Sequence, residues 1–137
     1  MATDEGIKII IIAERSPRAE TLTSMITGGI GKPANITVKS PADMGVIDGD
    51  KHADLCIIDL MSSTGPVVST ITSLREKQPG AKVIALHIYK TPELVRPLYD
   101  IGVDGYLFHD PPKKELAAAI EIVLGGGVYV PPFISIG

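Results

Sequence analysis

Short apolar runs alternate along the chain with segments in which apolar residues recur at helical spacing. Four of these runs end at a histidine or an acidic residue. The runs are rich in β-branched residues, which favour strands, and continuous apolar strands are typical of a parallel sheet that is buried on both faces. The pattern predicts five strands, over residues 7–13, 36–38, 55–58, 83–86 and 105–108.

Helix signals follow each strand. Ser16 before Pro17 predicts a helix that starts there and ends at Gly28 and Gly29, since a hydroxyl cap followed by proline is a typical first turn. A fourth helix opens at Thr91, and Pro97 inside it should remove one backbone hydrogen bond and bend it. The other predicted helices are a weak one over 43–47, one from 67 to the Gln78 stop, and one over 113–124.

Five strands alternating with five helices predict an α/β three-layer sandwich with a parallel sheet. The flavodoxin-like strand order 2-1-3-4-5 is the natural choice. In that order the switch point of the sheet lies between the first and third strands, so Glu14 and Asp59 should lie side by side.

The polar residues that end four apolar runs are the candidate site. Ligands of such sheets bind outside the carboxyl ends of the strands, so side chains that follow different strands meet there. The sequence therefore predicts that Glu14, Asp59, His87 and His109 converge on one small site.

The composition fits one domain and excludes some partners. With 137 residues and 45% hydrophobic content the chain can bury a single core, which we expect over residues 1–125, with 126–137 as a tail or linker. The net charge of -3 provides no basic footprint for nucleic acid or an anionic membrane.

Cys56 lies inside an apolar run and is expected to be an inert core thiol of a reduced compartment. No signal peptide or membrane-length apolar run is present, so a cytoplasmic protein is expected.

Three stretches resemble a known family. Residues 53–60 read ADLCIIDL, residues 102–107 read GVDGYL, and the last helix is rich in alanine and ends in glycine. Together they resemble the CheY-like receiver domain of two-component response regulators, and the segment from Gly102 onward is similar to the NarL/LuxR type. The resemblance covers the chain from Lys8 to about Pro132. It implies that Asp59 accepts a phosphoryl group from a sensor histidine kinase and that Tyr106 is the switch aromatic.

Other positions of the family's site differ in this chain. Where the family has two adjacent acids that hold Mg²⁺, this chain has Ala13 and Glu14. His87 stands where the family has a phosphate-binding Thr or Ser, and His109 stands where it has a nearly obligatory Lys. The loop after Asp59 lacks the family's Met-Pro and is shorter.

These differences weaken the chemistry that the resemblance implies. Phosphoryl transfer depends on positive charge placed against the transferring oxygens, much of it from Mg²⁺. With Glu14 and Asp59 as the remaining acids, Mg²⁺ should bind weakly. An imidazole is protonated only roughly one quarter of the time at pH 7, so His109 is a poor substitute for lysine. We therefore expect a pseudo-receiver, in which imidazoles cover a carboxylate pocket and which signals through protein contacts with phosphorylation at Asp59 weakened or lost.

Two alternatives remain open. One is a receiver that is still phosphorylated and regulates transcription through a C-terminal DNA-binding domain outside these residues. The other is a metal-binding module, because Glu14, Asp59, His87 and His109 are ligand types that zinc selects. Ser62 to Gly65 is read as an ordinary polar turn, so no organic cofactor is expected. No nucleophile has a base beside it in a known motif, so the chain is not expected to be an enzyme.

The resemblance also suggests partners. A sensor histidine kinase or another signalling protein is expected, together with a homodimer through the fourth helix, the fifth strand and the fifth helix. Arg96, Tyr99, Lys113 and Lys114 flank that face. The GGGVYVPP tail resembles the linker to a helix-turn-helix domain. This chain alone is not expected to bind nucleic acid or a membrane.

Overall fold

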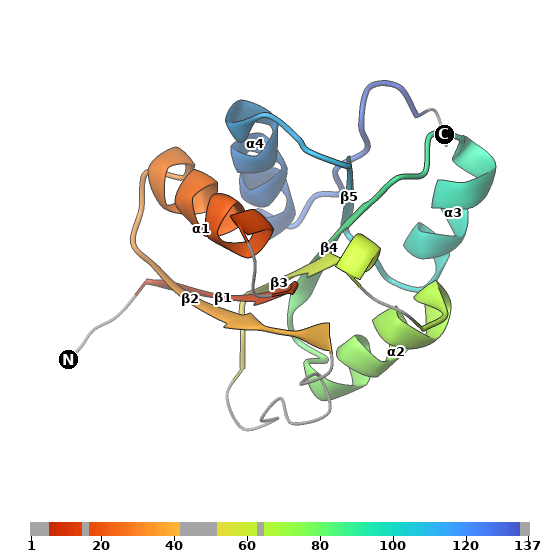
Figure 1. Cartoon of the computed structure of the whole chain (residues 1–137), viewed down its shortest axis with the longest axis horizontal. Helices are drawn as coiled ribbons and strands as arrows, with labels where there is room; N and C mark the ends of the chain where they lie inside the picture. Colours follow the sequence, from red (N-terminus) through yellow and green to blue (C-terminus); the bar gives the residue numbers. More distant parts are fainter. Residues whose placement is uncertain (1–5, 15–16, 42–51, 63–64, 135–137) are drawn as a thin grey trace.

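Five parallel strands form one sheet at the centre of the molecule (Figure 1). The computed structural model describes residues 6–14, 17–41, 52–62 and 65–134. The strands lie in the order β2-β1-β3-β4-β5, which confirms the predicted fold class and topology. Their bounds are β1 Ile7–Ile12, β2 Ala34–Lys39, β3 Leu55–Asp59, β4 Lys82–His87 and β5 Gly105–Phe108.

The strand register brings the carboxyl ends of the strands to one edge of the sheet. Ile12 of β1 pairs with Ile58 of β3, so the next residues, Ala13 and Asp59, come side by side at this edge. Asp59 pairs in turn with Leu86, the residue before His87. All five residues of β3 are buried, which explains why this central strand reads as an unbroken apolar run up to its final acid.

Helices cover both faces of the sheet (Figure 1). α1 and α4 pack with one apolar cluster, and α2 and α3 pack with a second cluster on the opposite face. A short 3-10 turn, η2, follows β3 directly. The bounds are α1 Pro17–Gly29, η2 Leu60–Ser62, α2 Val67–Lys77, α3 Pro92–Asp100 and α4 Lys113–Leu124.

The described part of the chain contains four α-helices, whereas the sequence predicted five. The missing one is the weak helix over 43–47, which falls outside the described residues, as does Ser16, the predicted cap of α1. α4 has the predicted bounds. α3 continues through Pro97, whose ring nitrogen has no hydrogen to donate to the preceding turn.

The chain returns to the sheet after α4. Tyr129 forms an isolated parallel bridge with Gly105 on β5, so the predicted tail contacts the domain. The predicted boundary at residue 125 stays a prediction.

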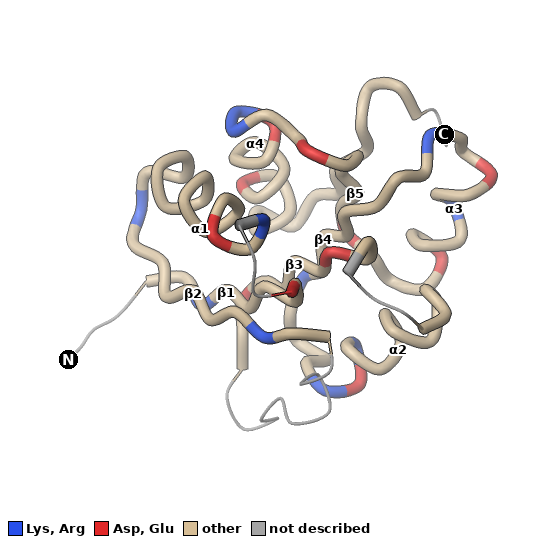
Figure 2. Tube along the Cα trace, in the orientation of Figure 1, with Lys and Arg blue, Asp and Glu red and all other residues tan. Residues whose placement is uncertain are grey.

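The distribution of charge along the described chain agrees with the low net charge. Lys and Arg are spread over separate elements and alternate with acidic residues (Figure 2). None of the helices described here is both long enough and apolar enough to span a membrane.

Candidate functional site

Asp59 is the buried acid at the centre of the site. It ends β3 and is 1% exposed. Its Oδ1 accepts a hydrogen bond from the backbone N–H of Met61 at 3.2 Å, because η2 turns the chain back toward the carboxylate. Its Oδ2 accepts one from Nε of Arg18 at 2.7 Å. Both carboxylate oxygens therefore have a donor from the protein itself.

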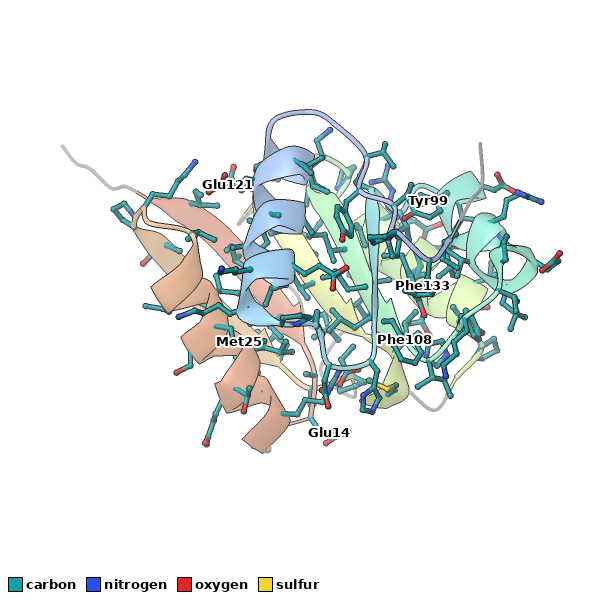
Figure 3. All side chains as sticks on the ribbon, turned by 90° about the horizontal axis from the view of Figure 1, so that it is seen from above. Glu14, Met25, Tyr99, Phe108, Glu121 and Phe133 are labelled. Atoms are coloured by element: carbon teal, nitrogen blue, oxygen red, sulfur yellow. The ribbon has the colours of Figure 1, made fainter. Side chains whose placement is uncertain are left out.

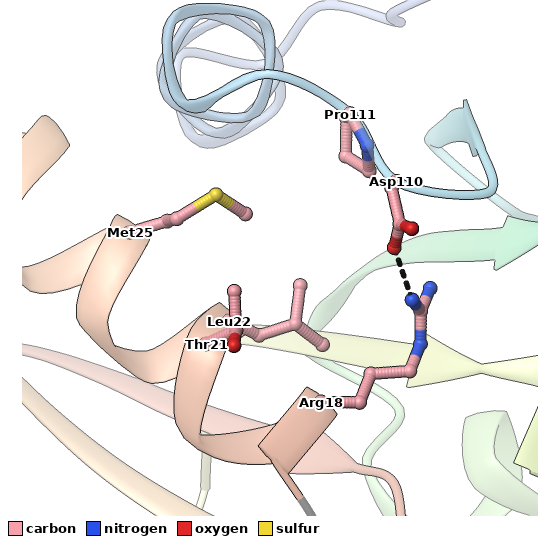
Figure 4. Close-up of a pocket in the computed structure, with 6 residues that line it drawn as sticks. All are labelled: Arg18, Thr21, Leu22, Met25, Asp110 and Pro111. Carbon is pink, nitrogen blue, oxygen red and sulfur yellow. Dashed lines mark hydrogen bonds and ion pairs between the residues drawn. The ribbon is translucent and has the colours of Figure 1, made fainter.

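Arg18 provides the positive charge of the site. It lies in the first turn of α1, and its guanidinium joins three groups from two other segments. Nε binds Asp59, Nη1 binds the carboxylate of Asp110, and Nη2 donates to the carbonyl oxygen of His109 at 2.6 Å. The planar guanidinium suits this arrangement, since its donors point in fixed and divergent directions. Figure 4 shows Arg18 reaching from α1 to Asp110 in the loop before α4.

His109 contributes its backbone to this network. Its φ of 48° lies in the left-handed region, where a residue other than glycine is strained by about 1 to 3 kcal/mol unless the surroundings stabilise it. Its carbonyl accepts the bond from Arg18, and its N–H donates to the carbonyl of His87 at 2.8 Å. The imidazole is half exposed, with Nδ1 3.2 Å from Oδ2 of Asp110. The expectation that this imidazole covers Asp59 therefore stays a prediction, and the contact that the structure gives it is the one with Asp110.

His87 lies at the end of β4 and is a neutral group near Asp59. Burial lowers the pKa of its imidazole, and the nearby Asp59 carboxylate offsets only part of that effect. The ring lies 4.4 Å from the ring of Tyr89, centre to centre. Its buried Nδ1 has no hydrogen-bond partner among the described residues. His87 thus cannot act as a permanent cation at neutral pH.

Tyr106, the predicted switch aromatic, is completely buried in β5. Its hydroxyl donates to the carbonyl of Tyr89 at 2.8 Å, and burial raises the pKa of the phenol. The hydrogen bond ties β5 to the loop that follows β4.

The remaining acid of the predicted pair, Glu14, is exposed at the end of β1 (Figure 3). Ala13, which precedes it, is fully buried and offers only a methyl group where the family has a carboxylate. Mg²⁺ prefers oxygen ligands in octahedral geometry, and Oδ2 of Asp59 already binds a cationic side chain. The donors, as they are arranged, do not fit a resident Mg²⁺.

The four-residue metal module is also not supported. Across residues 6–14, 17–41, 52–62 and 65–134, no group of three or more His, Cys, Asp or Glu side chains is placed to hold a metal ion. The imidazole of His109 points to Asp110 and Glu14 is exposed, so the predicted ligands do not form one set.

A cavity of about 330 Å³ lies beside the Arg18 network. It is bounded by α1 and the loop before α4 and lined by Arg18, Thr21, Leu22, Met25, Asp110 and Pro111 (Figure 4). Its volume is at the lower end of the range for small-molecule sites.

Arg18 and Asp110 were not predicted as site residues from the sequence. One signal was present, because a cation in the first turn of a helix opposes the helix dipole and needs an acidic partner to offset it. Asp110 directly follows His109, so the β5–α4 loop carried that acid in the sequence.

Comparisons with known proteins bear on the fold and on the sequence similarity of the chain. No protein-family model matches the chain. A glycerol metabolism activator from Pseudomonas putida is 24% identical over 128 residues, 93% of this chain and 58% of that protein. The transcriptional regulatory protein DesR of Bacillus subtilis is 29% identical over 120 residues, 81% of this chain and 59% of that protein.

A solved structure shows the same fold. The isolated REC domain of RcsB from Salmonella enterica serovar Typhimurium, in the presence of the phosphomimetic BeF3-, matches with a TM-score of 0.79 at 14% identity. The match covers 94% of this chain and 96% of that domain. The comparisons thus confirm the resemblance: the chain has the receiver-type fold and is similar in sequence to response regulators. It spans less than two thirds of the length of the two regulators above.

Proposed function

We propose that the chain is a pseudo-receiver, a two-component signalling domain that acts through protein contacts and in which phosphorylation of Asp59 is weakened or lost. The observation that carries this proposal is the ion pair between Arg18 and Asp59, at 2.7 Å. Arg18 is a permanent internal cation on the carboxylate that would have to attack a phosphoryl donor.

The chemical reasoning concerns the attacking oxygen. For transfer, one carboxylate oxygen of Asp59 must form a bond to phosphorus while the bond from phosphorus to the donor's leaving group breaks. Oδ2 binds Nε of Arg18 and Oδ1 binds the N–H of Met61, so both oxygens share their negative charge with a donor and are weaker nucleophiles. A charge-assisted hydrogen bond is worth about 1.5 to 3 kcal/mol, and each ~1.4 kcal/mol slows a reaction about tenfold.

The other positive charges of the site do not offset this effect. The lowered pKa of His87 leaves it neutral, and the imidazole of His109 is paired with Asp110. The donors around Asp59 do not fit Mg²⁺ as they stand, so we derive no step through a metal.

One observation favours the alternative of an active phosphoacceptor. A guanidinium can also stabilise charge on a transferring phosphoryl group, and Arg18 already lies beside the nucleophilic carboxylate. In that case Arg18 would assist transfer, which is the opposite of its proposed role. The two functions therefore predict opposite effects of changing Arg18.

The experiment is incubation with acetyl phosphate and Mg²⁺, followed by intact-protein mass spectrometry. The proposal predicts little or no phosphoryl adduct on the wild type and none on Asp59→Asn. Arg18→Met should gain adduct or remain unlabelled. Rapid stoichiometric labelling of the wild type that falls in Arg18→Met would overturn the pseudo-receiver and establish the active alternative.

The cellular setting belongs to the same proposal. We place the domain in a longer transcription regulator, because the two relatives are regulators of which this chain spans 58% and 59%. Its partners would be a sensor histidine kinase or another signalling protein, and no catalytic activity of its own is proposed. A cytoplasmic location remains a prediction from the sequence.

A further inference from the structure

The C-terminal segment, residues 128–134, lies along the outer edge of β5. Tyr129 bridges to Gly105 in parallel, and its N–H donates to the carbonyl of Asp104 at 2.9 Å. In return, the N–H of Tyr106 on β5 donates to the carbonyl of Tyr129 at 3.4 Å. Because β5 is the last strand of the sheet, these bonds use backbone groups on what would be an open edge.

Tyr129 also joins the two helices that flank this edge. The hydroxyl of Tyr99 on α3 donates to the carbonyl of Tyr129 at 2.5 Å. The hydroxyl of Tyr129 donates to Oε2 of Glu115 on α4 at 2.5 Å. Burial raises the pKa of both phenols, so both remain protonated donors across the physiological range. One residue is thus tied to helices on opposite faces of the sheet.

The side chains of Tyr129 and Val130 point to opposite faces of the sheet, as neighbouring residues of an extended segment do, and the chain then turns at residues 132–133. Tyr129 packs against the apolar cluster of α1 and α4, whereas Val130 packs against the cluster of α2 and α3. Ile134 is buried in that second cluster and is 4% exposed. Phe133 meets the ring of Phe108 edge to face at 5.7 Å between centres.

We propose that the C-terminal segment, through the bridge at Tyr129, closes the start of the β5 edge within the same molecule and thereby keeps a second copy of the chain from pairing there. An edge strand presents unpaired N–H and C=O groups to any other extended chain, and an apolar edge invites such pairing. With the segment released, the partner that fits is a second copy, because its own residues 128–134 have the matching pattern of hydrogen bonds and side chains.

This inference depends on the fold and not on the chemistry of Asp59, so it stands or falls separately from the pseudo-receiver proposal. It also bears on the predicted homodimer through α3, β5 and α4, the fourth helix, fifth strand and fifth helix of the sequence prediction. In the closed chain the segment occupies the middle of that face.

The test combines hydrogen exchange with sedimentation equilibrium on the full chain. The variant Tyr99→Phe/Ile134→Ala removes one hydrogen bond and one buried side chain that hold the segment. The matched control is Ile30→Ala, because Ile30 is also 4% exposed but belongs to the cluster of α1 and α4. Tyr99→Phe alone serves as a milder second variant, since it leaves the core intact.

In the wild type the amides of Tyr106 and Tyr129 should be protected and the chain monomeric. In the double variant both amides should exchange more than about tenfold faster, and a dimer should form as concentration rises. The Ile30→Ala control should show neither change. The inference is overturned if the two amides exchange equally fast in wild type and both variants, or if the double variant associates no more than the wild type.

Discussion

Removing the charge of Arg18 while keeping its apolar stem tests how strongly the guanidinium holds the site together. In Arg18→Met the methylene groups remain, but three donors are lost, to Asp59, Asp110 and the carbonyl of His109. The Asp59 side chain is fully buried in this pair, and that of Arg18 is 24% exposed. In the variant the Asp59 carboxylate would keep its hydrogen bond from the N–H of Met61 but lose its counter-ion.

The magnitude follows from this intermediate burial. Exposed ion pairs contribute about 0 to 1 kcal/mol, and breaking a fully buried pair costs about 3 to 5 kcal/mol. For a buried acid with a partly exposed partner we expect a loss of about 2 kcal/mol in the free energy of unfolding. The matched control is Arg75→Met, since Arg75 makes one bond to a carbonyl, Nη1 to Ala81 at 3.3 Å, and should cost about 1 kcal/mol or less.

The assay is urea unfolding of the two single variants Arg18→Met and Asp59→Ala and of their double variant. In this double-mutant cycle, the changes in unfolding free energy of the two single variants are subtracted from that of the double variant, which leaves the coupling energy of the pair. We expect a coupling of about 1 to 2 kcal/mol. A coupling below about 0.5 kcal/mol, which is the usual error of additivity, would refute the reasoning that Arg18 stabilises the buried carboxylate.

The remaining predictions concern the imidazole, a glycine turn and the thiol. Folding lowers the pKa of His87 from 6.5, so the unfolded chain binds a proton at this imidazole more readily than the folded chain does. The free energy of unfolding should therefore be highest above about pH 6.5 and fall below it. Urea unfolding of His87→Phe should show a weaker dependence on pH in this range. Gly102→Ala should lose about 1 to 3 kcal/mol in the same assay, because φ is +104° there and a Cβ would lie 2.9 Å from Nε of Arg75, whereas Gly80→Ala, which meets open space, should be near neutral. Burial raises the pKa of the Cys56 thiol to about 12, so iodoacetamide at pH 8 should label it only in urea; rapid labelling of the folded chain would contradict its core position.

The central strands could be predicted from the sequence because burial on both faces leaves an uninterrupted apolar run. β3 and β5 match the predicted positions to within one residue. β2 was predicted too short, over 36–38, because this edge strand is half exposed and includes the polar residues Asn35 and Lys39. The return of the tail to β5 could not be predicted, since its pairing with Gly105 depends on contacts far apart along the chain.

The positions of the site were predicted better than its chemistry. Asp59 and His87 follow neighbouring strands, so the topology alone brings them close. The direction of the His109 side chain was not predictable, because a left-handed residue after β5 turns the carbonyl toward Arg18 and leaves the imidazole half exposed. Arg18 approaches from a helix, and a pattern of strand ends contains no information about it.

The most direct measurement of the central claim is the exchange of the Arg18 Nε–H proton with water, followed by nitrogen-15 NMR. The wild type should show a slowly exchanging Nε–H, because that proton lies between Nε and Oδ2 of Asp59. In Asp59→Ala this proton should exchange rapidly, while in Asp110→Ala, which removes the partner of Nη1, it should remain slow. Equal exchange of the Nε–H in the wild type and Asp59→Ala would show that Arg18 does not hold Asp59, and the proposed function would lose its support.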